Sequence, residues 1–140
     1  MKSVNPYVYF NGNTKEAFQF YQSVFGGELS LMTFRDFGDN DMGVAPENLD
    51  MVAHASIPLS SEHVLMGTDT TDESFTIGNN TYITLETDTQ EEANDLFNKL
   101  SNGGKVVMPL EETEWAESYG IVVDKFGVQW MVTFTGSKQF

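Results

Sequence analysis

Residues 10–27 read FNGNTKEAFQFYQSVFGG, and residues 86–104 read ETDTQEEANDLFNKLSNGG. In both stretches apolar residues recur at helical spacing, and a pair of glycines follows them, which is typical of a helix end. Each stretch therefore predicts an amphipathic helix. The predicted apolar faces consist of Ala17, Phe20, Tyr21 and Val24 in the first helix and of Ala93, Leu96, Phe97 and Leu100 in the second.

The helix starts also match. Asn13 and Glu16 have the spacing of a capping box, in which the cap side chain and a glutamate three residues later satisfy each other's backbone donors. Thr89 and Glu92 repeat this arrangement 76 positions later. Because cap, box and apolar face recur in one fixed register, we infer an internal repeat.

The segments around each helix extend the repeat. An extended apolar stretch precedes each helix, and three runs rich in β-branched and aromatic residues follow it. The sequence predicts an α+β fold of two βαβββ modules, about 1–72 and about 73–140, in one domain spanning 1–140. Each module is expected to form a curved, mostly antiparallel sheet with its helix on the convex face, so that the concave faces are available to form a pocket.

The two halves differ mainly in one loop. Residues 38–50, GDNDMGVAPENLD, show no periodicity and predict a mobile excursion between strands. The corresponding stretch of the second half, LEETEWAES at 110–118, is shorter and contains a tryptophan.

Composition limits the function. The chain has 140 residues, no cysteine and two histidines, so thiolate metal sites, disulfides and a cysteine nucleophile are excluded. With 21 acidic and 7 basic residues the net charge is −14, which disfavours nucleic acids and anionic membranes as partners. Since the sequence has neither a signal peptide nor an apolar run long enough to span a bilayer, we expect a soluble, cytoplasmic protein.

Three longer phrases resemble a known family: NPYVYFNGNTKEAFQFYQSVFGGE, HASIPLSSEHVLMGTD and EWAESYGIVVDKFGVQWMVTF. They are similar to the PhnB-like branch of the vicinal-oxygen-chelate superfamily, which includes glyoxalase I, bleomycin-resistance proteins and extradiol dioxygenases. Members of this branch often carry the label of a ubiquinone-pathway methyltransferase (3-demethylubiquinone 3-methyltransferase). That label is not adopted here, because the sequence has no Gly-rich loop between a strand and a helix that would seat a nucleotide-like cofactor.

The resemblance also implies where a metal would bind. Metal-dependent members place His, Gln or Glu on the first and last strands of each module. Aligning the two halves puts Pro6, Leu65, Tyr82 and Met131 at these positions. None is a good ligand for a divalent cation, and a register slip of one residue, to Tyr7, Met66, Ile83 and Val132 or Trp130, offers no better set. The sequence therefore predicts a protein with no metal and no cofactor.

Alternation along the strands, together with the resemblance, identifies candidate residues for a ligand-binding pocket. These are His54, Asp69, Tyr82, Glu86, Trp115, Tyr119, Gln129 and Met131. No catalytic residue is assigned.

Several of these candidates also have a structural interpretation. His54 fits a general base or a ligand contact oriented by Asp69 and Glu86. It also fits a hydrogen-bonded histidine in a sheet or dimer interface, and we favour this structural interpretation. For Asp69, a turn cap is favoured over a ligand acceptor. Trp115 and Tyr119 fit either stacking on a flat ligand or core packing.

Three functions are compatible with these observations. The first is metal-free binding of a small organic molecule, with or without a reaction. The second is a metal-dependent glyoxalase or dioxygenase with unusual ligands, and the third is a drug-sequestering resistance protein. Because superfamily members commonly pair modules between chains, and a four-stranded sheet has open edges, we also expect a homodimer.

Overall fold

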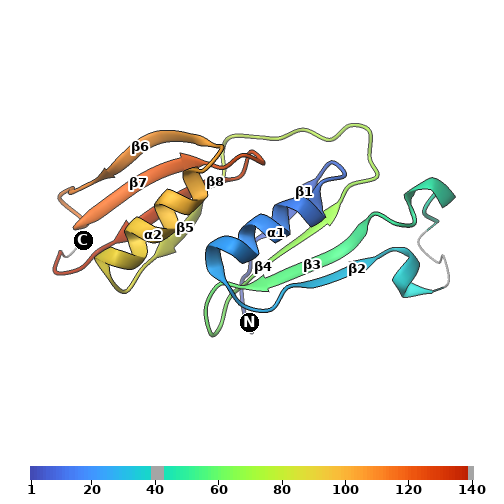
Figure 1. Cartoon of the computed structure of the whole chain (residues 1–140), viewed down its shortest axis with the longest axis horizontal. Helices are drawn as coiled ribbons and strands as arrows, with labels where there is room; N and C mark the ends of the chain where they lie inside the picture. The colour runs from blue at the N-terminus through green and yellow to red at the C-terminus, as the bar shows by residue number, and fades with distance from the viewer. Residues whose placement is uncertain (39–42, 139–140) are drawn as a thin grey trace. The chain divides into compact units, whose positions relative to one another are not determined.

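The computed structural model describes residues 1–38 and 43–138, and the chain forms two compact units, Met1–Thr76 and Ile77–Phe140. Each unit has one α-helix and a four-stranded sheet, and Figure 1 shows the helix lying against its sheet in each unit. Within the described ranges, no helix is long and apolar enough to cross a membrane.

The first unit follows the predicted order of strand, helix and three strands. Its elements are β1 (Tyr7–Phe10), α1 (Thr14–Phe25), β2 (Ser30–Thr33), β3 (Val52–Pro58) and β4 (Val64–Asp69). Two short 3-10 helices, η1 (Arg35–Phe37) and η2 (Pro46–Asn48), lie between β2 and β3. The predicted mobile loop 38–50 coincides with this connection, and its residues 39–42 lie outside the described part of the chain.

The second unit repeats this order without the 3-10 helices. Its elements are β5 (Ile83–Glu86), α2 (Gln90–Ser101), β6 (Lys105–Glu111), β7 (Ser118–Val123) and β8 (Gln129–Phe134). The shorter connection between β6 and β7 carries the tryptophan noted in the sequence.

Both sheets have the same topology, β1-β4-β3-β2 and β5-β8-β7-β6. The first and last strands of each unit pair in parallel, while the other pairs are antiparallel. A parallel pair needs a crossover, which here contains the helix and the two middle strands. The fold is α+β with two open, mixed sheets, which confirms the predicted class and the repeat.

In the first unit the helix packs on one sheet face through aromatic side chains. Phe18 is completely buried, and its ring meets Phe10 and Tyr21 edge to face, at 6.1 and 5.5 Å between centroids. A Cβ on Gly67 of β4 would lie 2.6 Å from the Phe18 ring, so only glycine allows this approach. The predicted helix face was correct for Ala17, Tyr21 and Val24 but wrong in including Phe20, which is only half-buried, and in omitting Phe18.

The second unit uses the same device. Phe97 of α2 approaches Gly120 of β7 so closely that a Cβ there would lie 2.7 Å from its ring. Trp130 of β8 is also completely buried and donates its indole N–H to Asp124 at 2.9 Å. The predicted face of α2 is confirmed for Ala93, Phe97 and Leu100, which are buried, and Leu96 is half-buried.

The two helix starts differ in their caps. In α2 the cap half of the predicted box is present, because the Thr89 hydroxyl accepts from the Glu92 N–H at 3.1 Å, whereas the Glu92 carboxylate accepts from the N–H of Asp88, one residue before the cap, at 3.0 Å. In α1 the Asn13 side chain makes no capping bond, contrary to the prediction. Its place is taken by Asp69 from the end of β4, whose Oδ1 accepts from the Thr14 N–H at 3.0 Å.

Asp69 also connects α1 to the sheet. Its Oδ1 accepts the Thr14 hydroxyl at 2.6 Å, and its Oδ2 accepts the Val52 N–H of β3 at 2.9 Å. Asp69 and Thr14 are both buried. Three donors from two elements therefore depend on one buried carboxylate.

We expect Asp69→Ala to lower the free energy of unfolding by about 2–4 kcal/mol, because it leaves buried donors of Thr14 and Val52 without an acceptor. Urea titration followed by circular dichroism measures this change. The matched control is Asp72→Ala, an exposed aspartate whose bonds stay within its own loop. Equal, small losses in both variants would contradict the role of Asp69.

We further expect Phe18→Ala to cost about 3–5 kcal/mol, because it empties a fully buried aromatic site. Phe20→Ala should cost less, and Gln19→Ala, on the exposed side of α1, should change the free energy by less than about 0.5 kcal/mol. The same urea titrations compare the three variants. A larger loss for Phe20→Ala than for Phe18→Ala would show that the assignment of the helix face is wrong.

Candidate functional site

In each unit the helix covers one face of the sheet, and we call the opposite face the open face of that unit. Strand pairing identifies its residues, because directly opposed residues point to the same side. In the first unit Tyr7 of β1 is opposite Met66 of β4, which is opposite Ser56 of β3. In the second unit Thr84 of β5 is opposite Met131 of β8, which is opposite Ile121 of β7.

Aromatic side chains dominate the open face of the first unit. Tyr7 and Tyr9 are 43% and 59% exposed, and their ring centroids lie 5.9 Å apart. The Tyr7 ring is also 5.9 Å from the imidazole of His54, and the Tyr7 hydroxyl lies 3.3 Å from its Nδ1. His54 is half-buried, so the strands hold its ring beside Tyr7 at the surface of this face.

Burial raises the pKa of the Tyr7 phenol, the neighbouring Tyr9 raises it further, and a hydrogen bond with Thr68 acts in the opposite direction. The phenol therefore stays protonated at neutral pH and can donate to Nδ1 of His54. An acceptor Nδ1 places the ring proton of neutral His54 on Nε2. Nε2 is then the nitrogen that can donate to a ligand.

Met131 is the centre of the open face of the second unit. Its sulfur accepts the Tyr119 hydroxyl at 3.4 Å and the Thr84 hydroxyl at 3.7 Å. Trp115 packs edge to face on Tyr119, with ring centroids 5.3 Å apart and an interplanar angle of 77°. The two hydroxyls point to the thioether, so this face offers mainly ring surfaces to a ligand.

The structure therefore brings together three of the predicted pocket residues, Trp115, Tyr119 and Met131. Gln129 lies on β8, two residues from Met131, and donates its amide to the Thr81 carbonyl at 2.9 Å. Tyr82 is exposed and directly precedes β5.

Asp69 does not line the pocket: its role is structural, as the favoured interpretation held, but its carboxylate is buried on the helix side and caps α1 instead of a turn. It consequently does not orient His54, whose neighbour is Tyr7. Glu86 is exposed, and its carboxylate accepts the N–H and the hydroxyl of Thr135. Glu86 thus holds the chain after β8.

The predicted positions of the metal ligands are also shifted. Leu65 is completely buried on the helix side, next to Met66, which lies on the open face. Phe10 is buried whereas Glu86, its counterpart 76 positions later, is exposed, so the helix offset does not match the faces of the strands. Matching the open faces pairs Tyr7 with Thr84 and Met66 with Met131.

These four residues do not fit a divalent metal. Two thioethers, a neutral phenol and a hydroxyl are poor partners for zinc, nickel, iron or manganese, which bind imidazole and carboxylate groups. Within residues 1–38 and 43–138, no group of three or more His, Cys, Asp or Glu side chains could hold a metal ion.

The sequence analysis missed three residues of the open faces as pocket candidates: Tyr7, Tyr9 and Met66. Alternation in YVYF was the available signal, since a strand with tyrosine at every second position presents both rings on one face.

For His54, we expect the Nε2–H tautomer in the unmodified protein and a mixture of tautomers in Tyr7→Phe, which lacks the donor to Nδ1. Long-range ¹H–¹⁵N correlation spectra of the imidazole distinguish these states. Tyr9→Phe is the matched control and should leave the spectrum unchanged. An Nδ1–H tautomer, or no response to Tyr7→Phe, would contradict the assigned bond.

Comparisons with known proteins agree on the family. The family model described as 3-demethylubiquinone-9 3-methyltransferase matches residues 2–133. The protein YjdN of Escherichia coli (strain K12) is 31% identical over 141 residues, covering 92% of each chain.

Solved structures give the same result. Protein PA1353 from Pseudomonas aeruginosa has 35% identity and a TM-score of 0.82, covering 99% of this chain and 98% of that one. A Bacillus cereus PhnB protein, described as a putative 3-demethylubiquinone-9 3-methyltransferase, has 26% identity and a TM-score of 0.72 over 94% and 98%. A glyoxalase/bleomycin resistance/dioxygenase family enzyme from Burkholderia phytofirmans shares the fold, with 13% identity, a TM-score of 0.63 and coverage of 94% and 97%. The chain belongs to the family whose model is described as 3-demethylubiquinone-9 3-methyltransferase, it is similar to a PhnB protein, and it has the fold of a glyoxalase/bleomycin resistance/dioxygenase family enzyme.

Proposed function

We propose that this protein binds a small organic molecule on its open sheet faces and does so without a resident metal ion. The observation that carries the proposal is the composition of these faces. Both present aromatic rings and methionine sulfur in the centre, at Tyr7 and Met66 in the first unit and at Tyr119 and Met131 in the second.

Exposure of large apolar side chains supports binding. Tyr7, Tyr9 and Met32 in the first unit and Trp115 in the second are each at least 36% exposed. Met32 of β2 is opposite His54, so it lies on the same face as the two tyrosines. Contiguous apolar surface of this kind marks binding sites, because its exposure to water is unfavourable.

The polar groups on these faces would orient a ligand. Nε2 of His54 can donate to a carbonyl or carboxylate oxygen, as argued from the Tyr7 contact. Sites for small molecules are usually lined by apolar side chains, with a few polar groups that orient the ligand.

The donor chemistry supports the absence of a metal. Superfamily enzymes of the metal-dependent kind need several nitrogen or oxygen ligands converging on one ion. The equivalent positions here carry Tyr7, Met66, Thr84 and Met131, and the carboxylates of Asp69 and Glu86 are engaged in capping bonds.

The methyltransferase description of the family does not support a methyl-transfer reaction for this chain. A nucleotide-like methyl donor is usually held by a Gly-rich loop between a strand and a helix. The two such connections are Asn11-Gly12-Asn13 before α1 and Thr87-Asp88-Thr89 before α2. Neither is Gly-rich.

The proposal predicts that the purified protein, incubated with a cell extract, retains an organic molecule in native mass spectrometry. Met66→Lys and Met131→Lys place a charge in the centre of an open face and should each reduce the bound fraction at least tenfold. Gln22→Lys, on the exposed side of α1, is the matched control and should have no effect.

Elemental analysis of the same samples tests the metal. We expect less than about 0.1 equivalent of zinc, nickel, iron or manganese, since the open faces lack suitable ligands. Stoichiometric metal that is lost in His54→Ala or Glu86→Gln would contradict the proposal. Retention of the same organic molecule by both lysine variants would place its site elsewhere.

A further inference from the structure

Trp115 and Tyr119 form a right-angled corner at one end of the open face of the second unit. Their rings are 5.3 Å apart at 77°, and Trp115 is 38% exposed. The Tyr119 hydroxyl donates to Met131, which holds the tyrosine ring beside the indole. Two aromatic rings near a right angle present two electron-rich surfaces to one small volume.

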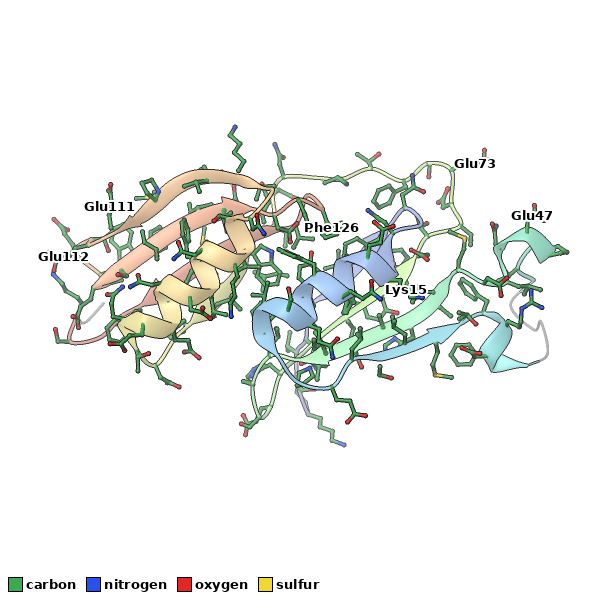
Figure 2. All side chains as sticks on the ribbon, in the orientation of Figure 1. Lys15, Glu47, Glu73, Glu111, Glu112 and Phe126 are labelled. Atoms are coloured by element: carbon green, nitrogen blue, oxygen red, sulfur yellow. The ribbon has the colours of Figure 1, made fainter. Side chains whose placement is uncertain are left out.

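A carboxylate lies beside this corner. Glu111, the last residue of β6, is directly opposite Tyr119 in the β6–β7 pair, so both side chains are on the same face. Glu111 is exposed, and Figure 2 labels it together with Glu112 at the end of β6. No salt bridge to Glu111 occurs within the described residues.

The neighbouring acids strengthen the negative potential. Four glutamates lie within residues 111–117. Glu112 is paired with Lys138 at 3.3 Å, and Glu117 accepts from the Ser137 N–H at 2.6 Å. The segment therefore carries one lysine partner against four carboxylates, and the charge next to the rings is negative.

We propose that the aromatic corner of Trp115 and Tyr119, with Glu111, binds the quaternary ammonium group of a small organic molecule. A cation without N–H groups is recognised by ring faces and by nearby negative charge, without hydrogen-bond acceptors aimed at it. The corner supplies both of these features. This inference rests on the proposed function and specifies the chemistry of the ligand.

Choline tests the proposal, with its uncharged isostere 3,3-dimethylbutan-1-ol as the matched ligand control. The protein has two tryptophans, and Trp130 is completely buried, so its indole N–H signal is an internal reference in ¹H–¹⁵N spectra. We expect choline to shift the Trp115 signal saturably and to bind at least tenfold more tightly than the isostere. Equal affinities of choline and the isostere would overturn the proposal. So would the absence of any shift of the Trp115 signal at about 100 mM choline, a concentration that would reveal even very weak binding.

Variants locate the charge and the rings. Glu111→Gln should weaken choline binding about threefold. Trp115→Leu should weaken it about fivefold or more, as measured by calorimetry because this variant lacks the Trp115 signal. Glu91→Gln removes the same charge from the exposed first turn of α2 and should have no effect. Equal weakening of choline binding in Glu91→Gln and Glu111→Gln would show that only the net charge of the protein matters, and it would overturn the proposed site.

The outcomes separate this inference from the proposed function. If choline fails while a neutral molecule is retained and lost in Met131→Lys, the open face binds ligands but the ammonium assignment is wrong. If choline fails and both lysine variants retain the molecule, both proposals are wrong.

Discussion

The close approach of a helix phenylalanine to a sheet glycine determines how each unit is built. Phe18 reaches Gly67 in the first unit and Phe97 reaches Gly120 in the second, at distances that no Cβ would allow. This contact places the helix on one face of its sheet and buries that face. The other face is left to side chains that the unit itself does not cover, and the candidate site lies there.

This division also explains the positions of the acids. Asp69 and Asp124 are buried, and each accepts several donors: Asp69 holds the start of α1, and Asp124 holds the turn after β7 and the indole of Trp130. These carboxylates maintain the fold and are unavailable to a ligand or a metal. The centres of the open faces carry rings and thioethers, and the first also carries an imidazole, which favours the binding of organic molecules over metal chemistry.

Periodicity was sufficient to predict the repeat, both helices and the order of strands, because cap and face signals are local. The faces of β1 and β4 were predicted one residue out of register, whereas alternation placed the faces of β5 and β8 correctly. A shift of one residue reverses the face of a strand, which is why Leu65 was expected where Met66 lies. Asp69 could not be assigned from sequence, because its contact with Thr14 spans 55 residues.

The open faces are proposed to bind an organic molecule without a metal. A crystal structure of the protein as purified, with anomalous data collected at the zinc, nickel, iron and manganese edges, tests this proposal most directly. We expect density for an organic molecule in contact with Tyr7 and Met66 or with Tyr119 and Met131, and no anomalous peak on either face. An anomalous peak ligated by side chains of the open faces, or an organic molecule bound only on the helix side, would contradict it.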